Sequence, residues 1–221
     1  MGARMADQPV IRRIAVLGAS GGIGRRVVAQ ALARGWAVSA QTRDGAKLGA
    51  FADRVRIVEG APTDPDVLRR LLAGADAVVF ALGVDRGGET TLFSETTHAL
   101  LPAMSAEGVT RLVAVTGVGA DETRGHGGFL YDRVVFPLFT RKRYADKDRQ
   151  EALIAASDTD WTIVRPAPFN DRPTRGELQV VTDVRPETRL RRIARDEVAG
   201  FLVDTLASGA YRRQRPFIGH P

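Results

Sequence analysis

The chain contains no cysteine, which excludes disulfide bonds, a thiolate nucleophile and zinc or iron–sulfur sites with cysteine ligands. No apolar run approaches the roughly 18–20 residues that a membrane-spanning helix needs, and residues 1–13 contain no apolar segment of the kind found in secretory signals. We therefore expect no membrane partner and a cytoplasmic location. Asp121 and Glu122 lie just before His126 but lack metal-ligand spacing with any other histidine, so no metal site is expected.

Charge of one sign is in small excess, with 32 Lys and Arg against 26 Asp and Glu and a formal net charge of +6. The basic residues gather only in short clusters, at 141–143, 189–195 and 212–215. None of these clusters is interleaved with aromatic residues, as a groove for single-stranded nucleic acid would be. We interpret them as solvated faces or phosphate contacts, and we expect no nucleic-acid partner.

Buried-strand patterns alternate with helical patterns along nearly the whole chain. The strand patterns lie at 14–17, 37–42, 55–58, 77–81, 112–116 and 161–165. The helical patterns lie at 24–33, 65–72, 90–106, 143–156 and 196–208. Apolar strands of this kind suit a parallel sheet that is covered on both faces. The alternation predicts a single α/β domain over 1–221, with a doubly wound, mostly parallel Rossmann sheet, helices on both faces and a small C-terminal appendage at the substrate site.

Three stretches break this rhythm. Residues 1–12 are expected to form a flexible N-terminus. The stretches 117–144 and 166–186 each follow the carboxyl end of a predicted strand, which is the edge where open α/β sheets bind ligands. We therefore predict that both stretches are substrate-site loops of a protein that acts on a small molecule, as a monomer or a homodimer.

The strongest signal is a glycine-rich turn between the first predicted strand and the first predicted helix. Gly18, Gly21 and Gly24 are spaced by three residues. One such glycine permits a tight turn, one lets the backbone approach a pyrophosphate, and one lets helix and strand pack closely. The phosphates would lie on free N–H groups at the helix N-terminus, where the helix dipole favours negative charge. The turn predicts a dinucleotide site formed by Gly18, Ser20, Gly21, Gly22, Ile23 and Gly24.

The end of the second predicted strand bears on the choice of dinucleotide. Arg43 offers a planar guanidinium suited to the 2′-phosphate of NADP, and Arg25 and Lys47 would add positive charge nearby. Asp44 is the alternative, because an acidic residue at this point can hold the ribose 2′-hydroxyl of NAD. We expect NADP as the cofactor, with NAD as the alternative.

These motifs together resemble the atypical short-chain dehydrogenase/reductase superfamily. The resemblance is to its branch of single-domain NAD(P)H-binding proteins, which includes biliverdin and flavin reductases and has NmrA-like proteins as neighbours. Besides the glycine turn, it rests on Thr42-Arg43-Asp44, on 77–83 and 108–113, on Lys147-x-x-x-Glu151 and on 160–166.

The resemblance implies further residues of the cofactor site. Ala81, Leu82 and Gly83 would line the cofactor ribose and pyrophosphate. Thr116 would point at the nicotinamide, and Lys147 would hold the nicotinamide ribose. Beside the carboxamide would lie Pro166 and Ala167, followed by Pro168.

The catalytic acid departs from the family pattern. Oxidoreductases of the superfamily carry a Tyr-x-x-x-Lys motif, but Arg143 stands four residues before Lys147 and Tyr144 stands three before it. On a helix these offsets lie on the same side, about 100° apart. Tyr144 is therefore a candidate acid together with the candidate catalytic residues Thr116 and Lys147, while His126 is an alternative proton donor.

We interpret the chain as an NADPH-dependent oxidoreductase that transfers hydride to a small planar conjugated acceptor, such as a flavin, quinone or tetrapyrrole, or to a carbonyl compound. Delocalised acceptors can take their proton from solvent, and the aromatic residues of 117–144 would stack on them, unless they pack a loop or a dimer contact. The first alternative is an NAD(P)H-binding redox sensor without efficient turnover. The second is a sugar-nucleotide epimerase or dehydratase, against which the short chain after Pro166 argues.

Overall fold

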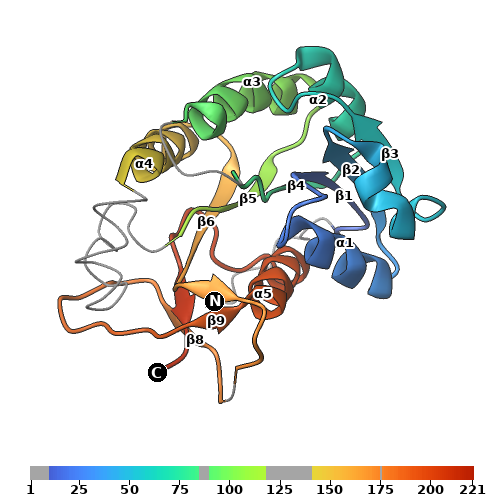
Figure 1. Cartoon of the computed structure of the whole chain (residues 1–221). Coiled ribbons are helices and arrows are strands. Elements are labelled where there is room, and N and C mark those ends of the chain that lie inside the picture. Colours follow the sequence, from blue (N-terminus) through green and yellow to red (C-terminus); the bar gives the residue numbers. More distant parts are fainter. Residues whose placement is uncertain (1–9, 85–89, 118–140, 175) are drawn as a thin grey trace, which may run out of the picture.

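A sheet with strand order β3-β2-β1-β4-β5-β6-β10-β8 forms the centre of the part of the chain that the structure describes. The computed structural model describes residues 10–84, 90–117, 141–174 and 176–221 (Figure 1). The strands of the sheet are β1 (Arg13–Leu17), β2 (Ala37–Thr42), β3 (Arg56–Glu59), β4 (Ala77–Phe80), β5 (Arg111–Val115), β6 (Asp160–Pro166), β8 (Gln179–Val181) and β10 (Phe217–Gly219). All neighbours pair in parallel except β10 and β8, which are antiparallel. The chain order reverses between β1 and β4, so the ligand crevice of this fold is expected there.

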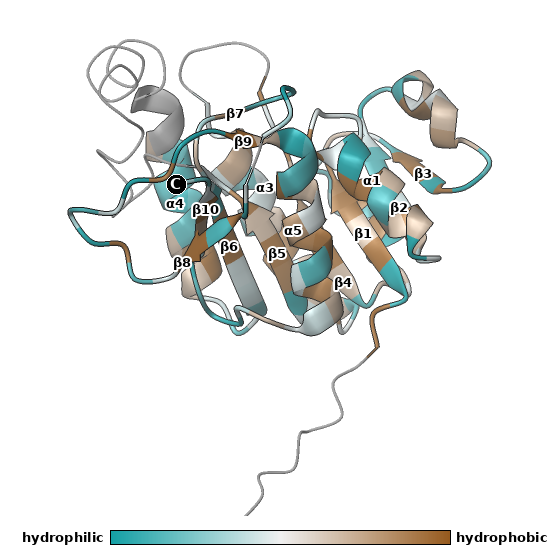
Figure 2. Cartoon of the chain, turned by 90° about the horizontal axis from the view of Figure 1, so that it is seen from below, coloured by the Kyte–Doolittle hydropathy of each residue, from teal (hydrophilic) through white to brown (hydrophobic). Residues whose placement is uncertain are grey.

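Helices cover both faces of the sheet (Figure 1). One face carries α1 (Gly24–Ala33) and α5 (Arg195–Ser208), and the other carries α2 (Pro65–Leu72), α3 (Leu92–Ala106) and α4 (Arg141–Ala155). Successive strand residues point to opposite faces. Ile14 and Val16 therefore pack towards α1 and α5, while Ala15 and Leu17 pack towards the other helices. This two-sided burial explains why β1 and β5 are apolar on both faces after their first residue, as Figure 2 shows.

The predicted fold class is confirmed: the chain forms a doubly wound, mostly parallel α/β domain. The sequence patterns did not reveal the 3-10 helix η1 (Gly45–Phe51), the strand β10 or the two-stranded sheet of β7 (Phe169–Asn170) and β9 (Ile193–Ala194). These elements are short, so they have little periodicity to detect. Strand β8, which lies within 166–186, pairs antiparallel with β10 instead of extending the parallel order.

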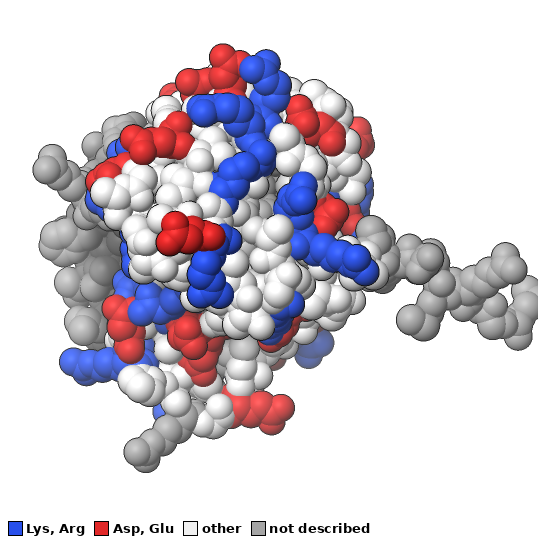
Figure 3. Space-filling model, turned by 90° about the vertical axis from the view of Figure 1, so that its right-hand side faces the viewer, with Lys and Arg blue, Asp and Glu red and all other residues white. Residues whose placement is uncertain are grey.

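The predicted substrate-site loops are only partly visible. Most of 117–144 and most of the expected flexible N-terminus lie outside the described residues, whereas 166–186 is described except at residue 175. The segment that carries β7 and β9 lies over the end of the sheet at which β1 and β6 finish (Figure 2). No helix among the described residues is long and apolar enough to cross a membrane. On the face shown in Figure 3, the basic side chains are interspersed with acidic ones.

A buried ion pair joins α4 to β6. Arg165 of β6 is fully buried, and its Nε lies 3.2 Å from both carboxylate oxygens of Glu151, while its Nη2 lies 2.5 Å from Oε2. Arg215, which lies over the ring of Trp161, is 3.8 Å from the same oxygen. The two segments that carry much of the family resemblance are therefore connected by charge as well as by apolar packing.

Breaking this pair should destabilise the fold. Glu151→Ala removes the carboxylate from the buried guanidinium, and loss of one partner of a buried pair costs about 3–5 kcal/mol. We expect the free energy of unfolding, measured by urea denaturation, to fall by that amount. The control is Asp183→Asn, which removes the exposed 3.1 Å pair with Arg185 and should cost less than about 1 kcal/mol. Equal effects of the two variants would contradict the structural role of the buried pair.

Candidate functional site

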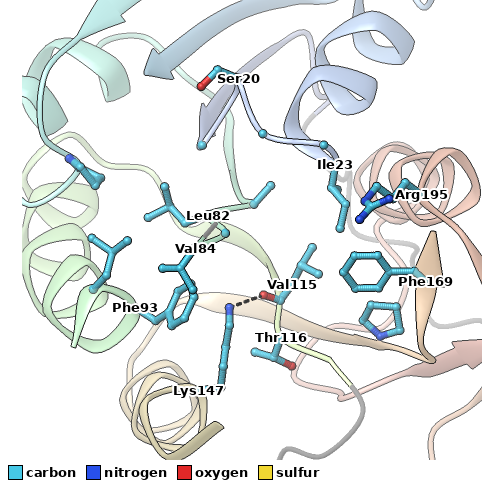
Figure 4. Close-up of a pocket in the computed structure, with 18 of the residues that line it drawn as sticks. Ser20, Ile23, Leu82, Val84, Phe93, Val115, Thr116, Lys147, Phe169 and Arg195 are labelled. Carbon is cyan, nitrogen blue, oxygen red and sulfur yellow. Dashed lines mark hydrogen bonds between the residues drawn. The ribbon is translucent and has the colours of Figure 1, made fainter. Parts of the chain in front are cut away.

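A cavity of about 750 Å³ lies at the carboxyl ends of β1, β4, β5 and β6, at the point where the strand order reverses (Figure 4). Every described residue that the sequence assigns to the site lines this cavity, apart from Gly24; the Tyr144 side chain lies outside the described residues. The residues concerned are Gly18, Ser20, Gly21, Gly22, Ile23, Arg43, Ala81, Leu82, Gly83, Thr116, Lys147, Pro166 and Ala167. The fold thus brings together residues that lie up to about 150 positions apart, as parallel α/β topology does at this edge.

The glycine turn is built around close backbone contacts. A Cβ atom on Gly18, whose φ is +74°, would lie 2.8 Å from the carbonyl oxygen of Ala81. A Cβ atom on Gly24 would lie 2.1 Å from the carbonyl oxygen of Gly18. Gly24 therefore does not line the cavity but lets α1 begin directly against the turn. Both positions require glycine for steric reasons that the spacing of the motif anticipates.

The turn leaves an open set of hydrogen-bond donors. Within the described residues, the backbone N–H groups of Ser20, Gly22, Ile23 and Gly24 donate no hydrogen bond. The N-cap residue Ile23 provides no capping side chain, and the first turn of α1 contains no acidic residue. Unpaired amides at the positive end of a ten-residue helix form a binding site for an anion such as a phosphate group.

Gln41 is a functional residue that sequence reasoning missed. It is buried in β2, where its side-chain oxygen accepts a hydrogen bond from Gly18 N at 3.1 Å and its amide nitrogen donates to Gly60 O at 2.7 Å. It therefore connects the glycine turn to the loop after β3. The sequence could have indicated this role, because Gln41 is an amide within a predicted buried strand and a buried amide needs hydrogen-bond partners.

The residues after β2 divide into two groups. Arg43 is exposed, lines the cavity and has no hydrogen bond or ion pair with a described residue, and Lys47 also lines the cavity. Asp44 is instead the N-cap of η1, where its Oδ1 accepts a hydrogen bond from Ala46 N at 3.1 Å. Arg25 donates to the carbonyl oxygen of Lys47 and lies 5.6 Å from the ring centre of Phe51, so it does not line the cavity.

The other end of the cavity is mostly apolar. Ile23, Leu82, Val84, Phe93, Val115 and Phe169 line it (Figure 4). Lys147 lies among them and is 5% exposed; its Nζ donates to Val115 O at 3.0 Å and to Gln150 Oε1 at 3.2 Å. The same Nζ lies 3.6 Å from the centre of the Phe93 ring, within the range of a cation–π contact.

Thr116 is described in full, whereas Tyr144 is described only as part of α4. The Thr116 hydroxyl is buried and has no hydrogen-bond partner among the described residues. Tyr144 belongs to α4, three residues before Lys147, but its side chain lies outside the described residues. The same holds for His126 and the aromatic residues expected in the first substrate-site loop.

The charged residues among the described lining are all cations: Arg43, Lys47, Lys147 and Arg195. Arg195, the first residue of α5, was not expected at the site, because only tertiary structure brings α5 next to α1. A cavity of one sign attracts an anionic ligand. Among the described residues, no cluster of three or more His, Asp or Glu is arranged to hold a metal ion.

Comparisons with known proteins agree with this geometry. Residues 18–209 match the profile of the NAD(P)H-binding family. An uncharacterized chloroplastic protein of Arabidopsis thaliana is 30% identical over 206 residues, which cover 88% of this chain and 72% of that protein.

Solved structures share the fold. A short-chain dehydrogenase/reductase from Veillonella parvula, in complex with NADP, aligns with a TM-score of 0.78 and 17% identity over 96% of both chains. ChuY, an anaerobilin reductase from Escherichia coli O157:H7, aligns with a TM-score of 0.78 and 20% identity over 95% of this chain and 97% of that one. The match over residues 18–209 shows that the chain belongs to the NAD(P)H-binding family.

Proposed function

We propose that this protein is an NADPH-dependent oxidoreductase that transfers hydride to a small planar conjugated acceptor or to a carbonyl compound. The observation that carries the proposal is the polarity of the cavity along its length. Within the part of the chain that the structure describes, one end has a guanidinium without a partner, the middle has helix N-terminal amides that donate no hydrogen bond, and the other end is apolar. A dinucleotide with a phosphorylated adenosine ribose matches this order of charges.

The residues present fit such a cofactor. The amides of Gly22 and Ile23 are oriented by the start of α1 and would bind the diphosphate. Arg43 would form charge-assisted hydrogen bonds to a 2′-phosphate. Asp44 is committed to capping η1 through Ala46 N, which favours NADP over NAD. Pro166 and Ala167 would lie beside the nicotinamide ring.

When it is bound, a nicotinamide cofactor supplies hydride-transfer chemistry, and the protein must orient it and exclude water. The apolar side chains of Leu82, Val84 and Val115 would exclude water from the reacting end. Lys147 is held in place by the Val115 carbonyl oxygen, so its ammonium group would hold a ribose hydroxyl at a defined position. The unpartnered Thr116 hydroxyl is a further donor at this end.

The two classes of acceptor differ in whether they need a proton donor positioned by the protein. No Asp, Glu, His or Tyr is among the described residues that line the cavity. A delocalised acceptor tolerates this, because its proton can come from solvent after hydride transfer. A carbonyl compound instead needs a positioned acid, for which Tyr144 is the candidate.

A redox-sensing protein that binds the cofactor without efficient turnover is the second candidate function. It is favoured by the hydrogen bonds of Lys147 Nζ to Val115 and Gln150, since an ammonium group engaged within the protein has less capacity to support catalysis. NADPH oxidation with flavin or quinone acceptors supports the enzyme. Tight binding without such turnover supports the sensor.

Cofactor binding is the first test. We expect isothermal titration to show NADPH binding to the wild-type protein and none to Gly21→Asp, because the new carboxylate would stand beside the turn that holds the phosphates. Thermal unfolding of the variant without nucleotide serves as the folding control. Absence of binding by the wild-type protein to either pyridine nucleotide would refute the proposed function.

Cofactor preference tests the role of Arg43. We expect Arg43→Ser to weaken NADPH binding by about tenfold to a hundredfold, since a hydrogen bond to a charged group contributes about 1.5–3 kcal/mol. NADH binding should change little. The matched control is Asp44→Asn, whose side-chain oxygen can still cap η1 and which should leave the preference unchanged. A shift in preference with Asp44→Asn alone would mean that Asp44 holds the ribose.

Turnover with two classes of acceptor tests the role of Tyr144. We expect Tyr144→Phe to lower kcat for carbonyl substrates by about a hundredfold or more, as loss of a general acid does. Reduction of flavin or quinone should change less than about twofold, because these acceptors obtain a proton from solvent. Undiminished carbonyl reduction by the variant would exclude Tyr144 as the acid.

A further inference from the structure

Arg195 lies directly over the glycine turn. It is the first residue of α5, and its side chain, which is 30% exposed, lines the cavity. A Cβ atom on Gly22 would lie 3.1 Å from both Cδ and Nε of Arg195. In Figure 4 the guanidinium lies beside Ile23 and above Phe169, well away from Lys147. The side chain is therefore next to the free amides of the turn, where the turn meets the apolar end of the cavity, and apart from Lys147.

Two groups outside the turn hold the guanidinium in this position. Its Nη1 lies 3.0 Å from Oδ1 of Asp171, and its Cζ lies 5.2 Å from the centre of the Phe169 ring. The same Asp171 oxygen lies 3.0 Å from Nη2 of Arg26. One carboxylate oxygen is thus shared between two cations.

Arg26 and Arg195 differ in what else they contact. Arg26 also donates from Nη1 to Gly22 O at 2.6 Å and does not line the cavity, so it is part of the turn's support. Arg195 has no hydrogen bond to the turn and faces the cavity. The Asp171 side chain is 62% exposed, and ion pairs at exposed positions are weak. A dianion in a cavity without carboxylates is a stronger partner for a guanidinium than this aspartate.

We propose that Arg195 is a binding residue that clamps the diphosphate of the dinucleotide from the side opposite the helix N-terminus, and that Asp171 is the anion that competes for it. The inference rests on the proposed function, because it assumes a dinucleotide in this cavity. It goes beyond the glycine motif, since it adds two residues from elsewhere in the chain to the diphosphate site. Arg195 comes from α5, and Asp171 comes from the segment after β6.

The first test measures affinities for two nucleotides by isothermal titration. Arg195→Gln should weaken NADPH binding by about tenfold or more, because a charge-assisted hydrogen bond is lost. Binding of 2′-AMP, which has the 2′-phosphate but no diphosphate, should change by less than about twofold. Equal losses for both nucleotides would mean that the variant disturbs the site generally, and no loss for NADPH would overturn the clamp.

The second test uses the sign of the effect at Asp171. Because Asp171 competes for the guanidinium, Asp171→Asn should tighten NADPH binding in the wild-type background. In the Arg195→Gln background the same substitution should have no effect, since the competition is gone. Weaker binding by Asp171→Asn alone would overturn its role as the competing anion.

A matched control separates the clamp from loss of an exposed ion pair at α5. Arg34, at the end of α1, pairs with Asp204 of α5, and the exposed fractions of their side chains, 35% and 66%, resemble those of the Arg195–Asp171 pair. Arg34→Gln should leave NADPH affinity unchanged, because Arg34 does not line the cavity. An effect as large as that of Arg195→Gln would overturn the proposal.

Failure of the Arg195 proposal and failure of the proposed function would give different results. If the wild-type protein binds no NADPH, the proposed function is wrong and the clamp falls with it. If the wild-type protein binds NADPH and Arg195→Gln binds it equally well, only the clamp is wrong. A raised KM for an anionic acceptor with unchanged NADPH affinity would assign Arg195 to the substrate, and would also overturn the clamp.

Discussion

The contact between Gly24 and the Gly18 carbonyl oxygen is the constraint on which the site depends. Only a residue without a Cβ atom can approach the Gly18 carbonyl oxygen this closely, and the close approach allows α1 to begin directly against the turn that follows β1. The helix then presents its unpaired amides at the carboxyl edge of the sheet and not beyond it. Gln41 stabilises the arrangement from the other side by accepting a hydrogen bond from Gly18 N.

The far end of the cavity depends on a different interaction. The buried pair of Arg165 and Glu151 connects α4 to β6, and Lys147 lies one helical turn before Glu151 on the same side of α4. The position of that turn relative to the sheet places Lys147 Nζ next to the Val115 carbonyl oxygen. Packing and charge in the core therefore determine the position of the Lys147 ammonium group, the one buried ammonium group in the described cavity lining.

Charge is distributed unevenly between the cavity and the rest of the molecule. The overall excess of positive charge is small, but the described cavity lining contains cations and no carboxylates. Acidic residues near the site are engaged elsewhere: Asp44 caps η1, and Asp171 lies outside the lining, between Arg26 and Arg195. The distribution of charge, more than its sum, is what favours a polyanionic dinucleotide.

Some elements of the fold could be predicted from the sequence, and others could not. The apolar strands and the amphipathic α2 are evident from local patterns, because burial on both faces or on one face leaves a clear period. The glycine turn was equally evident, since its spacing reflects backbone sterics within one short segment. The elements η1, β7, β9 and β10 were not, because a few residues stabilised mainly by contacts with distant segments have no pattern of their own.

The sequence by itself determined the fold class and the glycine turn, because these depend on local periodicity and on backbone conformations that favour glycine. The expectation that Ala81, Leu82, Gly83, Thr116, Lys147, Pro166 and Ala167 line the same cavity came from the family resemblance. Only the tertiary structure decided that Arg43, and not Asp44 or Arg25, faces the cavity without a partner among the described residues, and that Arg195 lies over the glycine turn. The Arg25 side chain is taken up by the carbonyl oxygen of Lys47, and Arg195 is placed by the packing of α5 against α1; both contacts join segments apart in the chain, which no local pattern records.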